Sequence, residues 1–316
     1  MRGKIAFFTG STFSIPAIQS LIQLNKLACV VLVESQGNPD LLQLTVLLEQ
    51  ANVPMVQYSS FDEFKVISEL DRYQAGIGIV YLFRHKLSER IISFFSGDIF
   101  NLHPSELPSY RGPLPLYWQI RHGKTQCVLT LHRLTKYVDS GPVVTSQTVD
   151  IHPFDTLQSL SHQISQVVPA VINTLLIQLE SNAIASIEQS TIENMPAAPF
   201  FSEQDLLIDW LTHTSENIVC MARAGNVDFG GARIRLEENL FQLLQATQFK
   251  AEYSGINAGT VIEVSMTAGL LIKSIDGAVR LDIIATPYGV FDGYKFATLF
   301  NLNAGTSLLR TTQGTL

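Results

Sequence analysis

The chain has 316 residues, of which 46% are hydrophobic and 16% charged, and its formal net charge is -7. This composition fits one large or two medium globular domains. Three widely spaced cysteines (Cys29, Cys127 and Cys220) suggest reduced, buried thiols, and neither a disulfide framework nor a metal site. The acidic balance argues against a nucleic-acid partner, which usually requires a basic surface.

The sequence predicts a cytoplasmic protein. No apolar run approaches the length of a membrane span. The N-terminus, Met1-Arg2-Gly3-Lys4, leads straight into a strand-like segment without a cleavage site.

Apolar runs alternate with amphipathic segments over the first 95 residues, which predicts a mostly parallel, doubly wound sheet flanked by helices. Pro54 cannot donate to a ladder, so the strand that contains it is expected at an edge. Ser14 and Asp40 are predicted to cap the first two helices. The predicted strands are 5–8, 28–33, 53–56 and 75–80, and a short helix is expected at 88–95.

A turn at residues 9–13 follows the first predicted strand and invites a dinucleotide-binding interpretation. It reads Thr-Gly-Ser-Thr-Phe and lacks the three glycines that let a pyrophosphate approach a helix N-terminus. A tight structural turn is the better interpretation, and the loop is still expected to edge a pocket.

The second half of the chain changes character. After a helical turn at 116–121 and strands at 128–132 and 143–149, Asp155 is predicted to cap a long helix that runs to Leu175. The catalytic domain is predicted at 1–182, a polar linker at 183–203 and a smaller, β-rich accessory domain at 204–316. A helix at 215–224 and short strands predict a small OB-like β-barrel or an open sheet there, with strands at 232–236, 240–246, 260–264, 270–275 and 279–284.

Three polar residues form the candidate reaction centre. Asn101 and His103 are two apart at a strand end, so both side chains point to one side. Asp139 lies in a polar loop 36 positions after His103 (139 minus 103), across one helix and one strand, which suits an adjacent loop at one sheet edge. A carboxylate could orient the imidazole or accept a proton, and the amide could donate to a carbonyl oxygen that gains charge. These groups suit attack by an amine on a carbonyl.

Each of these residues also has an ordinary structural interpretation. An Asn after a strand is usually a turn former, a His before Pro is usually structural, and an Asp before Ser-Gly-Pro is most often a turn residue. Their convergence on one sheet edge is what favours the catalytic interpretation.

The run 101–112, NLHPSELPSYRG, together with Val138-Asp139-Ser140-Gly141-Pro142, resembles the formyltransferases that use 10-formyltetrahydrofolate. The resemblance continues more loosely through 208–210 and 259–262, which look like the accessory β domain of methionyl-tRNA and amino-sugar formyltransferases. It implies that Asn101 and His103 stabilise the intermediate and that Asp139 takes protons from the amine and holds His103.

The resemblance also implies where the donor binds. Main-chain groups of Tyr81-Leu82-Phe83-Arg84 and of the loop 135–139, with Tyr137 and Val138, would grip the pterin. Ser105, Glu106, Leu107 and Pro108 would line the slot. Glu106 stands where the family usually has Leu, which puts an acidic group near the donor entrance.

The acceptor is expected to be a small amine. Family members that act on initiator tRNA carry a basic loop after the second strand, whereas no Lys or Arg occurs between Lys26 and Lys65 here, where the segment is Glu34-Ser35-Gln36-Gly37-Asn38-Pro39-Asp40. Residues 201–316 carry 8 Lys and Arg against 12 Asp and Glu, a net of -4 (8 minus 12). Segments 81–87 and 128–134 resemble the amino-sugar-modifying members instead. The candidate acceptor contacts are Thr9, Arg84, His85, Arg111 and Phe229; for the charged ones a solvated rim is an equal alternative.

The first hypothesis is therefore N-formylation of an amino sugar nucleotide or a related biosynthetic intermediate. Methionyl-tRNA formylation is the alternative, followed by hydrolysis of the folate formyl group. A folate-binding module without chemistry is the least favoured, because the Asn/His/Asp set is intact. A homodimer is compatible with the sequence, which does not decide the oligomeric state.

Overall fold

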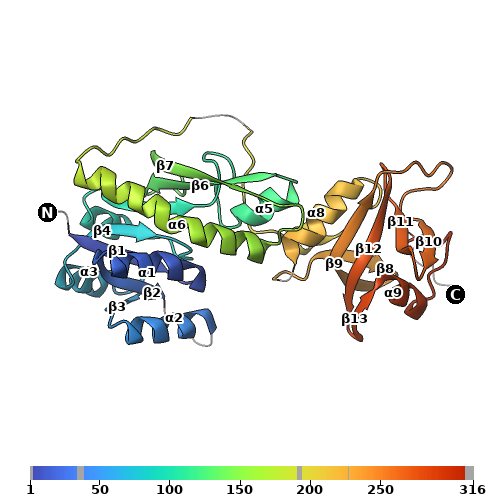
Figure 1. Ribbon diagram of the computed structural model, residues 1–316, viewed down its shortest axis with the longest axis horizontal. Coiled ribbons are helices and arrows are strands. Elements are labelled where there is room, and N and C mark those ends of the chain that lie inside the picture. The colour runs from blue at the N-terminus through green and yellow to red at the C-terminus, as the bar shows by residue number, and fades with distance from the viewer. Residues whose placement is uncertain (1–2, 34–38, 191–193, 227, 310–316) are drawn as a thin grey trace. The chain divides into compact units, whose positions relative to one another are not determined.

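The computed structural model describes residues 3–33, 39–190, 194–226 and 228–309, which form two compact units (Figure 1). The first unit takes in residues 1–115, 126–150 and 161–199, and the second takes in 116–125, 151–160 and 200–316. Most of the segment that lacks basic residues after the second strand, 34–38, lies outside the described residues.

The first unit is built on a seven-stranded sheet in the order β3-β2-β1-β4-β5-β6-β7. The first five strands in the chain run parallel, while β6 and β7 are antiparallel to their neighbours. The mostly parallel sheet predicted from the sequence is therefore confirmed, with β3 at an edge. The strands are β1 (Lys4–Thr9), β2 (Leu27–Val33), β3 (Met55–Tyr58), β4 (Ala75–Val80), β5 (Ile99–His103), β6 (Gln126–Arg133) and β7 (Val143–Asp150).

Helices pack on the sheet because its strands are apolar on both faces. Alternate residues of β1 point to opposite sides. Ala6 and Phe8 join one core cluster with residues of α3 and α4, such as Leu70 and Ile91. The helices of this unit are the 3-10 turn η1 (Thr12–Ser14), α1 (Ile15–Gln23), α2 (Pro39–Gln50), α3 (Glu63–Arg72), α4 (Glu89–Phe94) and most of α6 (Leu157–Glu180).

Helix α6 is long and apolar enough, by length and composition alone, to cross a membrane, which the sequence analysis did not anticipate. Its apolar stripe is buried, with Leu160, Ile164, Val168 and Leu175 fully inside the protein. That burial is the pattern of a core helix.

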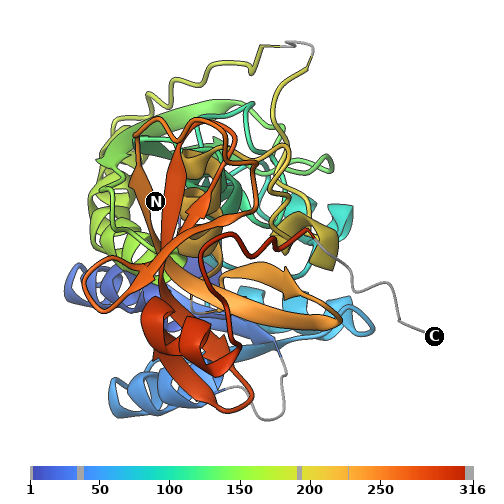
Figure 2. The same cartoon turned by 90° about the vertical axis from the view of Figure 1, so that its right-hand side faces the viewer.

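The second unit, whose strands are drawn in orange and red in Figure 2, is built on an antiparallel sheet. The strand order is β10-β11-β12-β9-β8, and β13 pairs with β12. Its strands enclose a core that includes Trp210, Phe241 and Phe296. The strands are β8 (Ala232–Leu236), β9 (Asn239–Phe249), β10 (Val261–Ser265), β11 (Gly269–Lys273), β12 (Ala278–Thr286) and β13 (Gly289–Asp292). The helices are α5 (Pro115–Arg121), α7 (Glu203–Leu206), α8 (Ser215–Gly225) and α9 (Gly293–Leu299).

Three predicted helix caps differ in detail. Helix α6 begins at Leu157, and it is the Thr156 hydroxyl that accepts from the Ser159 N–H, at 3.3 Å. Asp155 instead accepts from the His152 N–H at 2.7 Å, one turn earlier. Ser14 makes no side-chain capping bond, because its hydroxyl donates to a carbonyl of the preceding turn. Asp40 lies inside the first turn of α2.

Candidate active site

The carboxyl end of β5 presents Asn101 and His103 on the same side of the sheet. β5 is paired with β4 on one side and with β6 on the other, so its backbone groups are used and its side chains stand away from the sheet. His103 is buried, with 4% of its surface exposed. Its Nε2 lies 2.9 Å from the carbonyl oxygen of Tyr110, which leaves the Nδ1 edge for the site.

Asp139 meets both residues, although it comes from the loop between β6 and β7. Its Oδ1 accepts from Asn101 Nδ2 at 3.3 Å, and its Oδ2 lies 3.6 Å from His103 Nδ1. Oδ2 also accepts from the Gly112 N–H at 3.0 Å. Asp139 has a φ of 48°, in the left-handed region that non-glycine residues seldom adopt. The structure thus brings together the three residues on which the sequence hypothesis depends. It does so with Asp139 in a strained backbone conformation.

The environment favours an ionised carboxylate beside a neutral imidazole. Burial raises the pKa of Asp139, but the neighbouring His132 and His103 rings and the Gly112 N–H together hold that pKa below its ordinary value. Burial lowers the pKa of His103, against the opposing effect of Asp139. At neutral pH the pair is therefore in the deprotonated state, which can accept a proton from a substrate.

A second histidine, His132, completes the cluster and was missed by the sequence analysis. It stands directly opposite Asn101 in the β5–β6 pairing and is fully buried. Its Nε2 lies 3.1 Å from Asn101 Nδ2 and 3.8 Å from Asp139 Oδ1. The strand pattern alone does not distinguish it from its neighbours in β6, and only the register with β5 shows which residues it faces.

The loop that carries Asp139 is hydrogen-bonded to a residue of segment 183–203, which was predicted to be a linker. The side-chain amide of Gln189 donates to the carbonyls of Asp139 and Gly141, at 3.0 and 2.8 Å. Its oxygen accepts from Arg111 Nε at 3.2 Å and also from that guanidinium's terminal nitrogen. Further along, the Ala198 N–H donates to the Arg111 carbonyl at 2.9 Å. Part of this segment therefore packs beside the candidate site, and Gln189 was a second residue that the sequence analysis missed.

The loop after β4 was predicted to bind the donor. The side chain of Tyr81 belongs to the core because it is buried. The backbone N–H of Tyr81 donates to the Phe8 carbonyl at 3.0 Å. Leu82 has a φ of 54° and a side chain that is 37% exposed. Phe83 packs edge-on against Tyr58, and Arg84 is exposed.

The other residues predicted to contact the donor differ in how far their side chains are exposed. Ser105 is fully buried and its hydroxyl donates to the Ser109 carbonyl at 2.7 Å, so this side chain supports the loop instead of lining a slot. Glu106 is exposed, and Leu107 and Pro108 are half-buried. Tyr137 and Val138 are 66% and 59% exposed. The main-chain contacts predicted for these loops stay predictions.

The predicted acceptor contacts do not form one group. Thr9 is fully buried, and its hydroxyl accepts from the Ser11 N–H at 3.4 Å, as expected of a turn residue. Arg111 is engaged with Gln189, whereas Arg84 and His85 are exposed. Phe229 belongs to the second unit, where it stacks edge-on with Phe201 at 4.5 Å.

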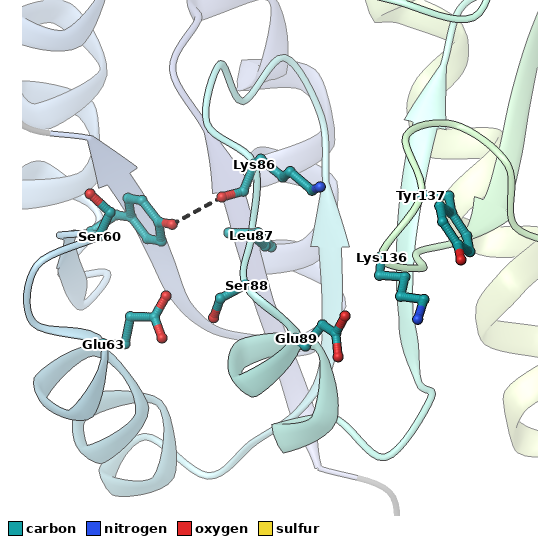
Figure 3. A pocket seen from close by; sticks show the side chains of 9 residues that line it. Ser60, Glu63, Lys86, Leu87, Ser88, Glu89, Lys136 and Tyr137 are labelled. Carbon is teal, nitrogen blue, oxygen red and sulfur yellow. Dashed lines mark hydrogen bonds between the residues drawn. The ribbon is translucent and has the colours of Figure 1, made fainter.

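A cavity of about 490 Å³ opens beside the loops that follow β4 and β6 (Figure 3). Lys86 and Glu89 lie toward one side of it, and Lys136 and Tyr137 lie across from them. The Tyr58 hydroxyl, which also lines the cavity, donates to the Lys86 carbonyl at 3.3 Å. The lining residues are Tyr58, Ser60, Glu63, Lys86, Leu87, Ser88, Glu89, Lys136 and Tyr137.

A mostly parallel sheet with an Asn/His/Asp cluster at its carboxyl edge, followed by an antiparallel unit, defines the class to which this protein belongs. The family model described as formyl transferase matches residues 4–176, and the one described as formyl transferase, C-terminal domain, matches 201–289. The first match covers more than half of the chain, so the protein belongs to the formyl transferase family, whose members transfer formyl groups.

Solved structures with the same fold include two sugar-modifying enzymes. WlaRD, a sugar 3N-formyl transferase crystallised with dTDP and 5-N-formyl-THF, has a TM-score of 0.64 and 19% identity over 88% of this chain and 97% of its own. An N-formyltransferase from Helicobacter canadensis, in complex with folinic acid and dTDP-3-aminofucose, has a TM-score of 0.63 and 17% identity over 91% and 99%.

HypX from Aquifex aeolicus, in complex with tetrahydrofolic acid, has a TM-score of 0.62 and 17% identity over 95% of this chain. The chain spans only 48% of HypX. At these identities the likeness concerns the fold.

Proposed function

We propose that this protein transfers the formyl group of 10-formyltetrahydrofolate to the primary amine of a small acceptor, an amino sugar nucleotide or a related biosynthetic intermediate. One observation carries the proposal: at the carboxyl edge of the sheet the Asp139 carboxylate lies 3.3 Å from the Asn101 amide and 3.6 Å from the His103 imidazole, although it comes from a separate segment. Ligands at such edges are the rule in open α/β sheets.

The carboxylate of Asp139 acts as the proton acceptor. An amine that adds to a carbonyl carbon becomes cationic and must lose a proton. Asp139 is ionised over the neutral range because its pKa is lowered, and the imidazole of His103 stands behind it at 3.6 Å. A proton that reaches the carboxylate converts the pair into a carboxylate beside an imidazolium, which is the charge-stabilised state.

Asn101 and His103 act on the formyl oxygen. As the amine attacks, the electron pair of the C=O bond moves onto this oxygen, and N–H donors lower the barrier in proportion to the charge they meet. The Asn101 amino group supplies one such donor. His103 supplies the second through Nδ1 once it is protonated, because its Nε2 is committed to the Tyr110 carbonyl.

The loops that follow β4 and β6 offer an apolar surface for the donor. When bound, 10-formyltetrahydrofolate supplies the formyl carbon. Three apolar side chains are uncovered at the two loops: Leu82, Tyr137 and Val138, at 37%, 66% and 59% exposure. These exposed apolar side chains suit contact with a flat ring system. Tyr137 also lines the cavity of about 490 Å³, whose volume lies within the size range of small-molecule sites. The main chain of 81–84 and 135–139 would hold the pterin, as the resemblance implies.

Charge favours a small acceptor over tRNA. A tRNA partner needs several cationic side chains to neutralise phosphates, and binding then weakens steeply with salt. The chain is acidic overall, and its last 116 residues carry a net of -4. The two sugar-modifying relatives in fold are described with dTDP or a dTDP-amino sugar. Exposed Arg84 and His85 are the remaining candidates for contact with an anionic acceptor.

The direct test is a screen of primary amines with 10-formyltetrahydrofolate, in which tetrahydrofolate formation and the mass of the product are both followed. Nucleotide-linked amino sugars, unlinked amino sugars and methionyl-tRNA form the panel, each at two salt concentrations. We expect an amino sugar nucleotide to gain one formyl group in a largely salt-insensitive reaction.

Three results would contradict the proposal. Formate release without any acceptor would indicate a hydrolase. Turnover with methionyl-tRNA alone, with a steep salt dependence, would indicate the tRNA reaction. Donor binding without turnover on any amine would indicate a binding module.

A further inference from the structure

In both histidines of the cluster, His103 and His132, one ring nitrogen is hydrogen-bonded to a backbone carbonyl. His103 Nε2 lies 2.9 Å from the Tyr110 carbonyl, and His132 Nδ1 lies 2.9 Å from the Arg133 carbonyl. A carbonyl only accepts, so each of these nitrogens carries the hydrogen. In the neutral rings, His103 Nδ1 and His132 Nε2 therefore hold bare lone pairs.

Both bare nitrogens face the same carboxylate. His103 Nδ1 is 3.6 Å from Asp139 Oδ2, and His132 Nε2 is 3.8 Å from Oδ1. Lone pairs facing a buried anion repel it, and one added proton on either ring turns repulsion into an ion pair. Besides Asp139, His132 and Arg111 act on His103, and both disfavour its cationic ring. The cluster can therefore store one proton in either of two places.

His132 also decides what Asn101 can do. The Asn101 amino group has two hydrogens, with His132 Nε2 at 3.1 Å and Asp139 Oδ1 at 3.3 Å as their acceptors. Both hydrogens are thus engaged in this state, and none is free for a formyl oxygen. If His132 Nε2 becomes protonated it turns from acceptor to donor, and it must give up the Asn101 hydrogen.

We propose that His132 is the second base of the site: it stores, by way of Asp139, the proton lost by the amine, and thereby releases an Asn101 N–H to the formyl oxygen. This inference rests on the proposed function. The N–C bond forms as the C=O electron pair moves to oxygen, and the amine proton passes to Asp139 and on to His132 Nε2 instead of to His103, so that Asn101 is then the N–H donor to the formyl oxygen. When the C=O bond re-forms, the donor's C–N bond breaks and its nitrogen recovers a proton from the cluster. Deprotonation and oxyanion stabilisation are thus coupled through one imidazole. His132 itself is a positioning residue, since it acts through Asp139 and Asn101.

The test is His132→Gln, with His132→Met beside it. A glutamine oxygen can still accept from Asn101 but cannot take the proton, whereas methionine loses both functions. We expect kcat to fall about a hundredfold in His132→Gln, within the range for a lost acid–base group, with the KM for the donor changed less than threefold. His132→Met should lose more, and the pH dependence of kcat should change in both. His162→Gln, an exposed histidine of α6, is the matched control and should keep wild-type kinetics.

A spectroscopic arm does not depend on turnover. The ¹⁵N spectrum of labelled histidine should show His132 as the Nδ1–H tautomer in the resting protein, and Asp139→Asn should lower the pKa of His103, because Asp139 favours the cationic form of that ring. Failure to find an acceptor would defeat the proposed function but leave this arm readable. The inference would be overturned by an Nε2–H tautomer of His132 or by a kcat within twofold of wild type in His132→Gln. It would also be overturned if the variant bound the donor more weakly and melted at a lower temperature without a change in the pH profile of kcat.

Discussion

Asp139 in the first unit and Asp276 in the second are each held by a small hydrogen-bonding network. The two networks differ in whether the partners can exchange a proton with the carboxylate. Asp276 accepts from the Ser215 N–H at 2.7 Å, the Ser215 hydroxyl at 3.0 Å and the Ser274 hydroxyl at 3.0 Å. Asp139 accepts from one backbone N–H and faces an amide and two imidazoles. Hydrogen bonds hold the pKa of both carboxyls below the ordinary value.

The difference lies in the partners. Hydroxyl and backbone donors fix Asp276 but cannot exchange a proton with it near neutral pH, so its network anchors the start of α8. Imidazoles can exchange protons with a neighbour in that range. A lowered pKa therefore does not distinguish a structural carboxylate from a reactive one, whereas the titratability of its neighbours does. The predictions below separate the two networks.

The largest effect is expected for Asp139→Asn. Asparagine keeps an oxygen for the Gly112 N–H but cannot take a proton, so kcat should fall about a thousandfold. Steady-state kinetics, with the melting temperature as the check on folding, measures this. An Asp139→Asn protein with kcat near wild type would remove the carboxylate from the reaction.

The next largest loss of turnover is expected for Asn101→Ala. It removes the donor to the formyl oxygen, typically worth roughly 3 kcal/mol, or a rate factor of about a hundred or more. Donor binding, measured by calorimetry, should remain nearly intact because the loss falls on the charged transition state. Comparable turnover in the variant would exclude Asn101 from the mechanism.

Gln189→Ala should have an intermediate effect. It frees the carbonyls of Asp139 and Gly141 from their clamp, so the left-handed conformation of Asp139 is less well enforced. We expect kcat to fall roughly tenfold through misplacement of the carboxylate, with faster amide exchange in residues 135–141. Gln147→Ala, an exposed position on β7, is the control. Unchanged exchange and kcat would show that the clamp is dispensable.

The pH dependence of wild-type kcat provides a milder test. The pKa of His103 lies below its ordinary value and that of Asp139 lies below the usual carboxyl range. The reactive state, with an ionised carboxylate and a neutral ring, is therefore present at neutral pH and is lost as the pH falls. We expect a plateau down to about pH 6.5 and a decline below it. A decline that begins above pH 7 would contradict this assignment.

Asp276→Asn should have the smallest effect on activity and a measurable one on stability. The lowered pKa of Asp276 stabilises the fold above its unfolded-state pKa, and this contribution disappears as the pH falls through the folded-state value. At pH 7 we expect the melting temperature to drop by about 2–4 °C with kcat unchanged, and the difference to vanish at low pH. A large loss of kcat would erase the contrast between the two carboxylates.

The sequence predicted most of the first unit because buried strands and amphipathic helices alternate there. Asn101 and His103 could be found because their two-residue spacing is a local property of a strand. His132 could not, because its importance depends on cross-strand register with β5. Gln189 was hidden in a polar segment whose composition suggests a linker, although its side chain bridges two loops. In the second unit, β13 and α9 were missed because the strand is only four residues long and passes directly into the helix.

The central claim is that Asp139 removes a proton from an amine that receives a formyl group. The most direct measurement compares wild type with Asp139→Asn, using 10-formyltetrahydrofolate labelled with ¹³C in the formyl group and an amino sugar nucleotide, with the label followed by mass spectrometry. The account predicts that wild type places the label on the amine and that Asp139→Asn does so about a thousandfold more slowly. Label released as formate in the wild-type reaction, or equal labelling by both proteins, would contradict it.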